Sequence, residues 1–301
     1  MSLSASPLSA GLTEEIKARA DHPLPSWVRV IRPGNTAFME TGRVLRGLKL
    51  HSVCEEARCP NIGECFGHGT ATFMLMGDLC TRGCRYCAVG KGRPQPLDPD
   101  EPKHLADAVG RLGLKHVVLT SVDRDDLEDG GAGHFAKTVW AVKQRFPKTT
   151  VEVLIPDFRG QPRALDRLLD SPVDVLNHNT ETVPRLYPDV RGGGRYTWAL
   201  AVLRRSKDVR PSLPTKSGLM LGLGETRDEL FDVLRDLRDV DCNILTLGQY
   251  LRPSWAHRAV TRFVTPGEFS ELKDEAMRMG FRHVESGPLV RSSYHAWEHL
   301  S

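Results

Sequence analysis

The chain has 301 residues, of which 40% are hydrophobic and 26% are charged, as expected for a globular protein with a large buried core. It carries 41 basic and 38 acidic residues, so it lacks the strong basic excess of a dedicated nucleic-acid-binding protein. No apolar run reaches the length of a membrane span, and we therefore expect neither nucleic acid nor a membrane among its partners.

The first 25 residues are rich in Ser, Pro and Ala and show no sustained periodicity. They have no basic stretch followed by an apolar core, so they do not resemble a secretory signal. Glu14 and Glu15 also argue against an organelle transit peptide, because such peptides are poor in acidic residues. These features predict a cytoplasmic location, where reducing conditions keep cysteines as free thiols.

A first group of three cysteines follows in the segment CEEARCPNIGEC. Cys54, Cys59 and Cys65 have the spacing C-x4-C-x5-C. Pro60 and Gly63 interrupt any helix here, so we expect the three cysteines on irregular backbone. Loops of this kind let metal-binding groups converge without the fixed spacing of a helix or strand.

From residue 70 onward, predicted strands alternate with predicted helices. The strands are 71–77, 116–121, 150–157, 173–179, 217–224 and 243–251. The helices are 102–114, one ending near 146, 163–169, 196–207, one after the capping residue Thr226 that reaches 240, and 266–279. Nearly continuous apolar strands predict an α/β fold with a parallel sheet covered on both faces. Six strand–helix units are too few to close a barrel of eight.

Chemically suggestive residues follow several of these strands directly. A second group of cysteines, Cys80, Cys84 and Cys87, has the spacing C-x3-C-x2-C and comes after the first strand. The other candidates are Asp123–Asp129 after the second strand, Asn177–Glu181 after the fourth, and Gln249 and Arg252 after the sixth. Active sites of parallel barrels lie at the carboxyl ends of the strands, so these residues are predicted to surround one site. A solvated loop and a helix cap remain the simpler explanations for the acidic and the Asn-rich segments.

The two cysteine trios are best explained as ligands of iron–sulfur clusters. Thiolates select iron–sulfur clusters or zinc. Structural zinc usually takes four ligands as two pairs, whereas three cysteines on a four-iron cubane leave one iron open. Disulfides fit poorly with seven cysteines and no secretion signal, and a redox pair formed by Cys84 and Cys87 would leave Cys80 unexplained.

The second trio resembles the signature of the radical S-adenosylmethionine superfamily. That signature is C-x3-C-x-aromatic-C, and Tyr86 fills the aromatic position. The resemblance implies an open (β/α)6 partial barrel and a [4Fe-4S] cluster whose open iron binds S-adenosylmethionine. It also makes Asn179 and Glu181 candidate contacts of the cofactor's ribose, methionyl group and positive sulfur.

Two further segments resemble the lipoyl synthase family. They are LHSVCEEARCPNIGEC, at residues 50–65, and RSSY, at residues 291–294. The resemblance implies that Ser292 is the fourth ligand of a second, auxiliary [4Fe-4S] cluster. It further implies that two sulfur atoms from this cluster are inserted at C6 and C8 of an octanoyl-lysine. The implied partners are octanoylated lipoyl-carrier domains, a reducing electron donor and an iron–sulfur carrier that reloads the auxiliary cluster.

The resemblance suggests three parts of the chain: an extension with the auxiliary motif at 1–69, the partial barrel at 70–280, and a C-terminal extension at 281–301. Another radical S-adenosylmethionine enzyme that inserts sulfur, and a non-enzymatic metal-binding protein, remain alternatives. Lys216 and Arg252 are left open as contacts of a carboxylate or peptide substrate, and His295 as a residue that orients the RSSY loop or as an ordinary surface histidine. Cys242 is expected to be a small buried apolar residue, and residues 192–194, GGG, are expected to form a flexible turn.

Overall fold

A curved sheet of eight strands forms the centre of the protein in the computed structural model, which describes residues 24–28, 36–56, 59, 61, 65 and 71–296. The strand order is β1-β2-β5-β6-β7-β8-β9-β10. The bounds are His51–Ser52, Thr72–Leu75, His116–Ser121, Thr150–Leu154, Val175–Asn177, Thr215–Leu221, Ile244–Gln249 and His283–Gly287. All neighbouring strands are parallel except β1, which pairs antiparallel with β2. Within the described residues the two ends of this order, β1 and β10, do not pair, so the barrel stays open.

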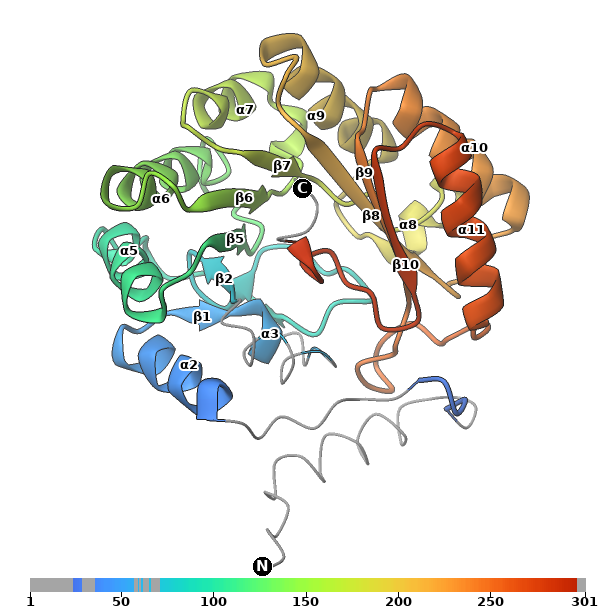
Figure 1. Cartoon of the computed structure of the whole chain (residues 1–301), viewed down its shortest axis with the longest axis horizontal. Coiled ribbons are helices and arrows are strands. Elements are labelled where there is room, and N and C mark those ends of the chain that lie inside the picture. The colour runs from blue at the N-terminus through green and yellow to red at the C-terminus, as the bar shows by residue number, and fades with distance from the viewer. Residues whose placement is uncertain are drawn as a thin grey trace, which may run out of the picture.

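Helices surround the outer face of the sheet (Figure 1). The longer ones are α2 Thr36–Gly47, α5 Glu101–Leu112, α6 Ala132–Arg145, α7 Pro162–Leu169, α9 Tyr196–Val209, α10 Arg227–Asp239 and α11 Pro266–Arg278. Each of α5 to α11 in this set buries one apolar stripe, such as Leu105 and Val109 of α5, against the strands. None of the helices that the structure describes is both long and apolar enough to cross a membrane.

The predicted α/β partial barrel is confirmed, and the predicted six strand–helix units are all present. The sequence prediction missed β10, which adds a seventh parallel strand beside β9. Its segment HVESG contains one fully buried residue, Val284, so it lacks the continuous apolar character of the other strands. Strand β10 forms because the edge of β9 offers unpaired backbone groups.

Two predicted helix starts are confirmed in detail. Thr226 accepts a hydrogen bond from the Glu229 backbone N–H, and the Glu229 side chain accepts one from the Thr226 N–H. Thr265 and Glu268 form the same capping box at the start of α11. Gly280 follows α11 with a φ of 93°, a left-handed conformation that glycine adopts without strain.

The predicted extensions join the same sheet as the barrel strands. Strand β1 lies within 1–69 and β10 within 281–301, and both pair with barrel strands. The division of the chain at these positions stays a prediction. The first 23 residues, Pro60 and Gly63 lie outside the described residues.

The interior of the sheet contains a buried ion pair. Lys216 of β8 and Glu152 of β6 are fully buried, and Lys216 Nζ lies 2.9 Å from Glu152 Oε1. Asn177 Nδ2 of β7 donates to the same carboxylate oxygen at 2.9 Å. Lys216 and Asn177 are therefore bound to Glu152 within the sheet and not exposed at its carboxyl edge.

Candidate functional site

The first cysteine trio and Cys87 of the second trio line one cavity at the carboxyl ends of the strands. The cavity has a volume of about 280 Å³. Residues from the first trio, the second trio, the strand ends and the C-terminal segment line it: Cys54, Cys59, Cys65, Tyr86, Cys87, Asn179, Glu181, Arg252, Arg291 and Ser292. In Figure 1 the C-terminal segment after β10 lies within the curve of the open sheet.

The first trio is tied to the C-terminal segment. Cys54 lies in the short helix α3, Val53–Glu56, and its carbonyl accepts from the Cys59 N–H at 3.0 Å. The Cys65 N–H donates to Asn61 O at 3.0 Å, and Asn61 Nδ2 donates to Leu289 O at 2.6 Å. The hydrogen bond from Asn61 to Leu289 brings the RSSY segment to the first trio.

Ser292 is bound to the barrel rim as well. Its Oγ accepts a hydrogen bond from Asn179 Nδ2 at 2.6 Å, and Asn179 Nδ2 also lies 3.2 Å from Glu181 Oε1. Ser292 and the first trio line the same cavity. The structure thus brings the candidate ligand Ser292 to the first trio and to two candidate cofactor contacts.

Burial opposes ionisation of the cysteines of the first trio. It raises the pKa of Cys54 to about 12, with the neighbouring Cys59 adding to this effect. Burial also raises the pKa of Cys59, while the nearby Arg291 guanidinium opposes that rise. A metal bound by these thiols would have to displace their protons, and Arg291 favours the thiolate of Cys59.

The second trio lies on the loop between β2 and α5. The short strands β3, Leu79–Cys80, and β4, Gly90–Lys91, pair within this loop. At its start Met76 has a φ of 67°, and its N–H donates to Glu101 Oε2 at 3.0 Å. Cys87 N–H donates to Cys84 O at 3.2 Å, and His257 Nε2 lies 2.9 Å from Cys87 O. The loop is thus held by contacts at both ends.

The six cysteines of the two trios are the type of donor that iron–sulfur clusters bind. All six are free thiols, and burial raises the pKa of Cys84 to about 11 and of Cys87 to about 12. Across the residues that the structure describes, no three His, Cys, Asp or Glu side chains stand close enough to share one ion. Cysteines around a cubane stand farther apart, because each binds a different iron.

The segment after β7 forms a polar wall of the cavity. Glu181 has a left-handed backbone with a φ of 70°, and burial raises the pKa of its carboxyl group. Asn179 Oδ1 is buried and accepts no hydrogen bond from the described residues, so it can accept from a bound ligand. Arg191 Nη1 donates to the Asn179 carbonyl and fixes this segment.

His178 faces away from this wall and is neutral. Its Nδ1 lies 2.8 Å from Ile155 O, which can only accept, so Nδ1 carries the proton. Nε2 is then an acceptor for Arg191 Nη2 at 3.4 Å. Burial, with the charge of Arg191, lowers the pKa of His178 to about 4.

Several other candidates have structural contacts. Gln249 Nε2 lies 3.0 to 3.1 Å from three carbonyl oxygens, its Oε1 accepts from the Val264 N–H, and Cys242 is fully buried, as predicted. Arg252 lines the cavity and donates to the carbonyls of Trp255 and His257. His295 stacks on Tyr294 with ring centroids 3.9 Å apart.

Four residues at this site were not predicted from the sequence: Asn61, Arg82, Arg191 and Arg291. Asn61, Arg82 and Arg291 lie inside the cysteine and RSSY motifs, and Arg191 directly precedes the three glycines. Because these four residues lie inside or beside the recognised motifs, their position in the sequence could have indicated that they belong to the site.

Comparison with known proteins identifies the family. The model of the radical SAM superfamily matches residues 74–237, and that of the N-terminal domain of lipoyl synthase matches residues 10–59. The chain is 58% identical over 273 residues to the lipoyl synthase of Nitrosococcus oceani, covering 90% of this chain and 84% of that protein. It is 57% identical over 274 residues to the lipoyl synthase of Thiobacillus denitrificans, covering 91% and 88%. The chain belongs to the lipoyl synthase family.

This result confirms the family that the cysteine and RSSY motifs predict. The chain is therefore a radical SAM enzyme that inserts sulfur. It implies S-adenosylmethionine and a [4Fe-4S] cluster as cofactors. Solved structures support the fold alone: methylornithine synthase has a TM-score of 0.54 at 16% identity, covering 82% of this chain and 77% of that one. The hydrogenase maturase HydG has a TM-score of 0.54 at 14% identity, covering 96% and 69%.

Proposed function

We propose that this lipoyl synthase inserts two sulfur atoms, at C6 and C8 of an octanoyl chain held as an amide on a lysine of a lipoyl-carrier domain. The observation that supports this most directly is the cavity shared by Cys54, Cys59 and Cys65 with Tyr86 and Cys87. Hydrogen removal and sulfur insertion occur at the same carbon. Two centres that perform them must therefore reach one bound chain.

Cys80, Cys84 and Cys87 would hold the [4Fe-4S] cluster that binds S-adenosylmethionine. Cys54, Cys59, Cys65 and Ser292 would hold a second [4Fe-4S] cluster. When bound, these groups would supply the electron, the hydrogen-abstracting 5′-deoxyadenosyl radical and, from the second cluster, the inserted sulfur atoms. The protein's contribution is to place and desolvate them.

Asn179, Glu181 and Tyr86 would bind S-adenosylmethionine. The buried acceptor Asn179 Oδ1 suits a hydroxyl or amino donor of the cofactor. The Glu181 carboxylate would offset its positive sulfur. Arg191 would act indirectly, because it holds the Asn179 carbonyl.

The apolar part of the cavity suits an octanoyl chain. Its lining includes Val53, Leu154, Met220, Tyr250, Leu251 and Pro253. An apolar wall excludes water and positions an unactivated hydrocarbon near both trios. The carrier lysine and its flanking backbone would supply further binding, so free octanoate should react poorly.

A reducing electron donor and an iron–sulfur carrier are further proposed partners. The first would deliver the electron for each cleavage of S-adenosylmethionine. The second would rebuild the sulfur-donating cluster after each product is formed. We retain the cytoplasmic location as a proposal, because seven free cysteines suit a reducing compartment.

An anaerobic assay tests this function. Reconstituted protein should contain about eight irons per chain, as two four-iron clusters require. With reductant, S-adenosylmethionine and an octanoyl-lysyl peptide, it should form 5′-deoxyadenosine and lipoyl peptide. The combined change Cys54→Ala, Cys59→Ala and Cys65→Ala should keep the first product and abolish the second. Equal turnover of free octanoate, or zinc in place of iron, would contradict the proposal.

A further inference from the structure

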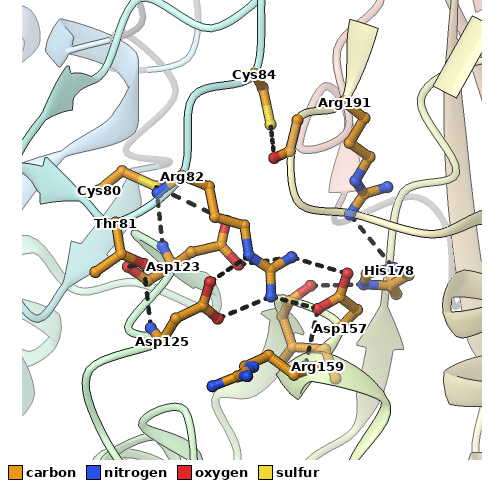
Figure 2. A network of polar contacts seen from close by, with 12 residues as sticks. Cys80, Thr81, Arg82, Cys84, Asp123, Asp125, Asp157, Arg159, His178 and Arg191 are labelled. Atoms are coloured by element: carbon orange, nitrogen blue, oxygen red, sulfur yellow. Dashed lines mark hydrogen bonds and ion pairs between the residues drawn. The ribbon is translucent and has the colours of Figure 1, made fainter. Parts of the chain in front are cut away.

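Arg82 is a buried arginine between two cysteines of the second trio. Its side chain is only 5% exposed. Nε and Nη2 donate to Asp125 at 2.7 and 2.8 Å, and Nη1 and Nη2 donate to Asp157 at 2.9 and 2.8 Å (Figure 2). The guanidinium thus makes two bidentate pairs, which only its planar fork of donors allows.

These pairs join three loops of the rim. Asp125 belongs to the loop after β5, and Asp157 follows β6. Asp123, also after β5, lies 3.4 Å from Arg82 Nη1. Arg82 therefore connects the cysteine loop with the ends of two neighbouring strands, as Figure 2 shows.

The same contacts bring two backbone donors to the sulfur of Cys80. The Arg82 N–H donates to Cys80 Sγ at 3.4 Å, and the Asp123 N–H donates to it at 3.3 Å. Thr81 Oγ1 donates to Asp123 O at 2.9 Å and accepts from the Asp125 N–H at 3.1 Å. The side chains of Arg82 and Thr81 thus hold the backbone on both sides of this sulfur.

Glycines on a neighbouring loop leave room for this arrangement. Gly193 has a φ of 86°, and a Cβ there would stand 3.0 Å from Arg82 Cδ. A Cβ on Gly192 would stand 3.3 Å from Gly83 O, and Gly192 O lies 4.0 Å from Cys84 Sγ. Gly192 and Gly193, which lie in the stretch that the sequence predicts as a flexible turn, therefore pack against the cysteine loop.

A purely structural role would require only that Arg82 neutralises the buried Asp157. The two donors on Cys80 Sγ go beyond that requirement. Hydrogen bonds to ligand sulfurs help set the reduction potential of an iron–sulfur cluster. Each donor offsets negative charge on the sulfur, so losing donors makes it harder to add an electron.

We propose that Arg82 is a positioning residue. Its two bidentate pairs with Asp125 and Asp157, here called the clamp, hold the Arg82 and Asp123 N–H groups on Cys80 Sγ. These two hydrogen bonds raise the reduction potential of the cluster. This inference rests on the proposed binding of a [4Fe-4S] cluster by Cys80, Cys84 and Cys87. The clamp also keeps the cysteine loop in place, which slows loss of iron.

The test compares Arg82→Lys with Arg85→Lys. Lysine keeps the charge but cannot form the two bidentate pairs. Arg85 is the matched control because it lies in the same loop, with its side chain 52% exposed and paired with Asp189 at the surface. Both variants are made in the full chain and reconstituted anaerobically. The reduction potential is read from the part of the electron paramagnetic resonance signal that changes when S-adenosylmethionine is added.

Arg82→Lys should shift the potential to more negative values and speed the release of iron to a chelator, whereas Arg85→Lys should match the wild type. An unchanged potential in Arg82→Lys, or an equal shift in both variants, would overturn the proposal. Thr81→Val covers the case in which Arg82→Lys does not fold, since it removes one hydroxyl and leaves every charge of the clamp. Thr81→Val should shift the reduction potential in the same direction by a smaller amount. An unchanged potential in Thr81→Val would contradict the proposal.

Iron analysis separates this proposal from the proposed function. If wild-type protein takes up no iron at the second trio, both proposals fail. If the wild type takes up iron normally and the potentials agree, only the role of Arg82 fails.

Discussion

Ser292 places a hydroxyl group of the C-terminal segment in the cavity. Its Oγ accepts from Asn179 Nδ2 and it shares a cavity with the first trio, so Ser292→Ala removes a candidate ligand without touching the second trio. We expect cleavage of S-adenosylmethionine to persist and lipoyl product to fall at least tenfold, the change that 1.4 kcal/mol produces. Product and 5′-deoxyadenosine are measured together by chromatography.

Two further variants control this prediction. Ser293→Ala changes the neighbouring serine, which the resemblance does not assign as a ligand, and should have a milder effect. Ser292→Cys should retain iron because thiolate suits it. Near wild-type product from Ser292→Ala would show that Ser292 is not required as a ligand.

His178 makes stability depend on pH. Burial holds its folded pKa at about 4, against 6.5 for the ordinary group. As the pH falls through 6.5, the unfolded chain binds a proton at His178 that the folded chain does not bind. The contribution of His178 to the free energy of unfolding is therefore complete above pH 6.5 and is lost as the pH falls toward 4. The urea midpoint of wild type should therefore fall more between pH 7.5 and pH 6.0 than that of His178→Asn. Equal falls in the two anaerobic titrations would refute the assignment.

At the scale of single elements, a capping box of two side chains holds the start of α10. Thr226 and Glu229 exchange two hydrogen bonds that satisfy backbone N–H groups at this end. Thr226→Ala should lower the free energy of unfolding by about 1 kcal/mol, and Thr226→Ser should lower it by less because serine also caps. Urea unfolding measures both, and equal losses would mean that the hydroxyl contributes nothing.

At the scale of the whole molecule, the ion pair inside the sheet links β6 to β8 across β7. Lys216 and Glu152 are fully buried, and burial lowers the pKa of Lys216. Lys216→Met leaves a buried carboxylate without its cation and should cost about 3–5 kcal/mol of unfolding free energy. The double variant with Glu152→Gln should recover most of this loss, because a neutral amide still accepts from Asn177.

A double-mutant cycle in urea checks that coupling. Additive losses from Lys216→Met and Glu152→Gln would mean that the two charges do not stabilise one another. The cycle also tests whether Lys216 has a role in the reaction. If it is structural, the double variant should regain activity together with stability.

The sequence by itself determined the features that depend on neighbouring residues. Cysteine spacing, the capping box at Thr226, the start of α11 at Pro266 and the six strand–helix units all follow from local pattern, and the structure confirms the cap, the start of α11 and the units. The tertiary structure decided what depends on distant residues. The weakly apolar segment of β10 became a strand because it pairs with the edge of β9. Sheet register joined Lys216 to Glu152, while rim loops from two strands supplied Asp125 and Asp157 to Arg82. The contact between Asn179 and Ser292 likewise forms only in the folded chain, because no local spacing encodes which strand ends become neighbours.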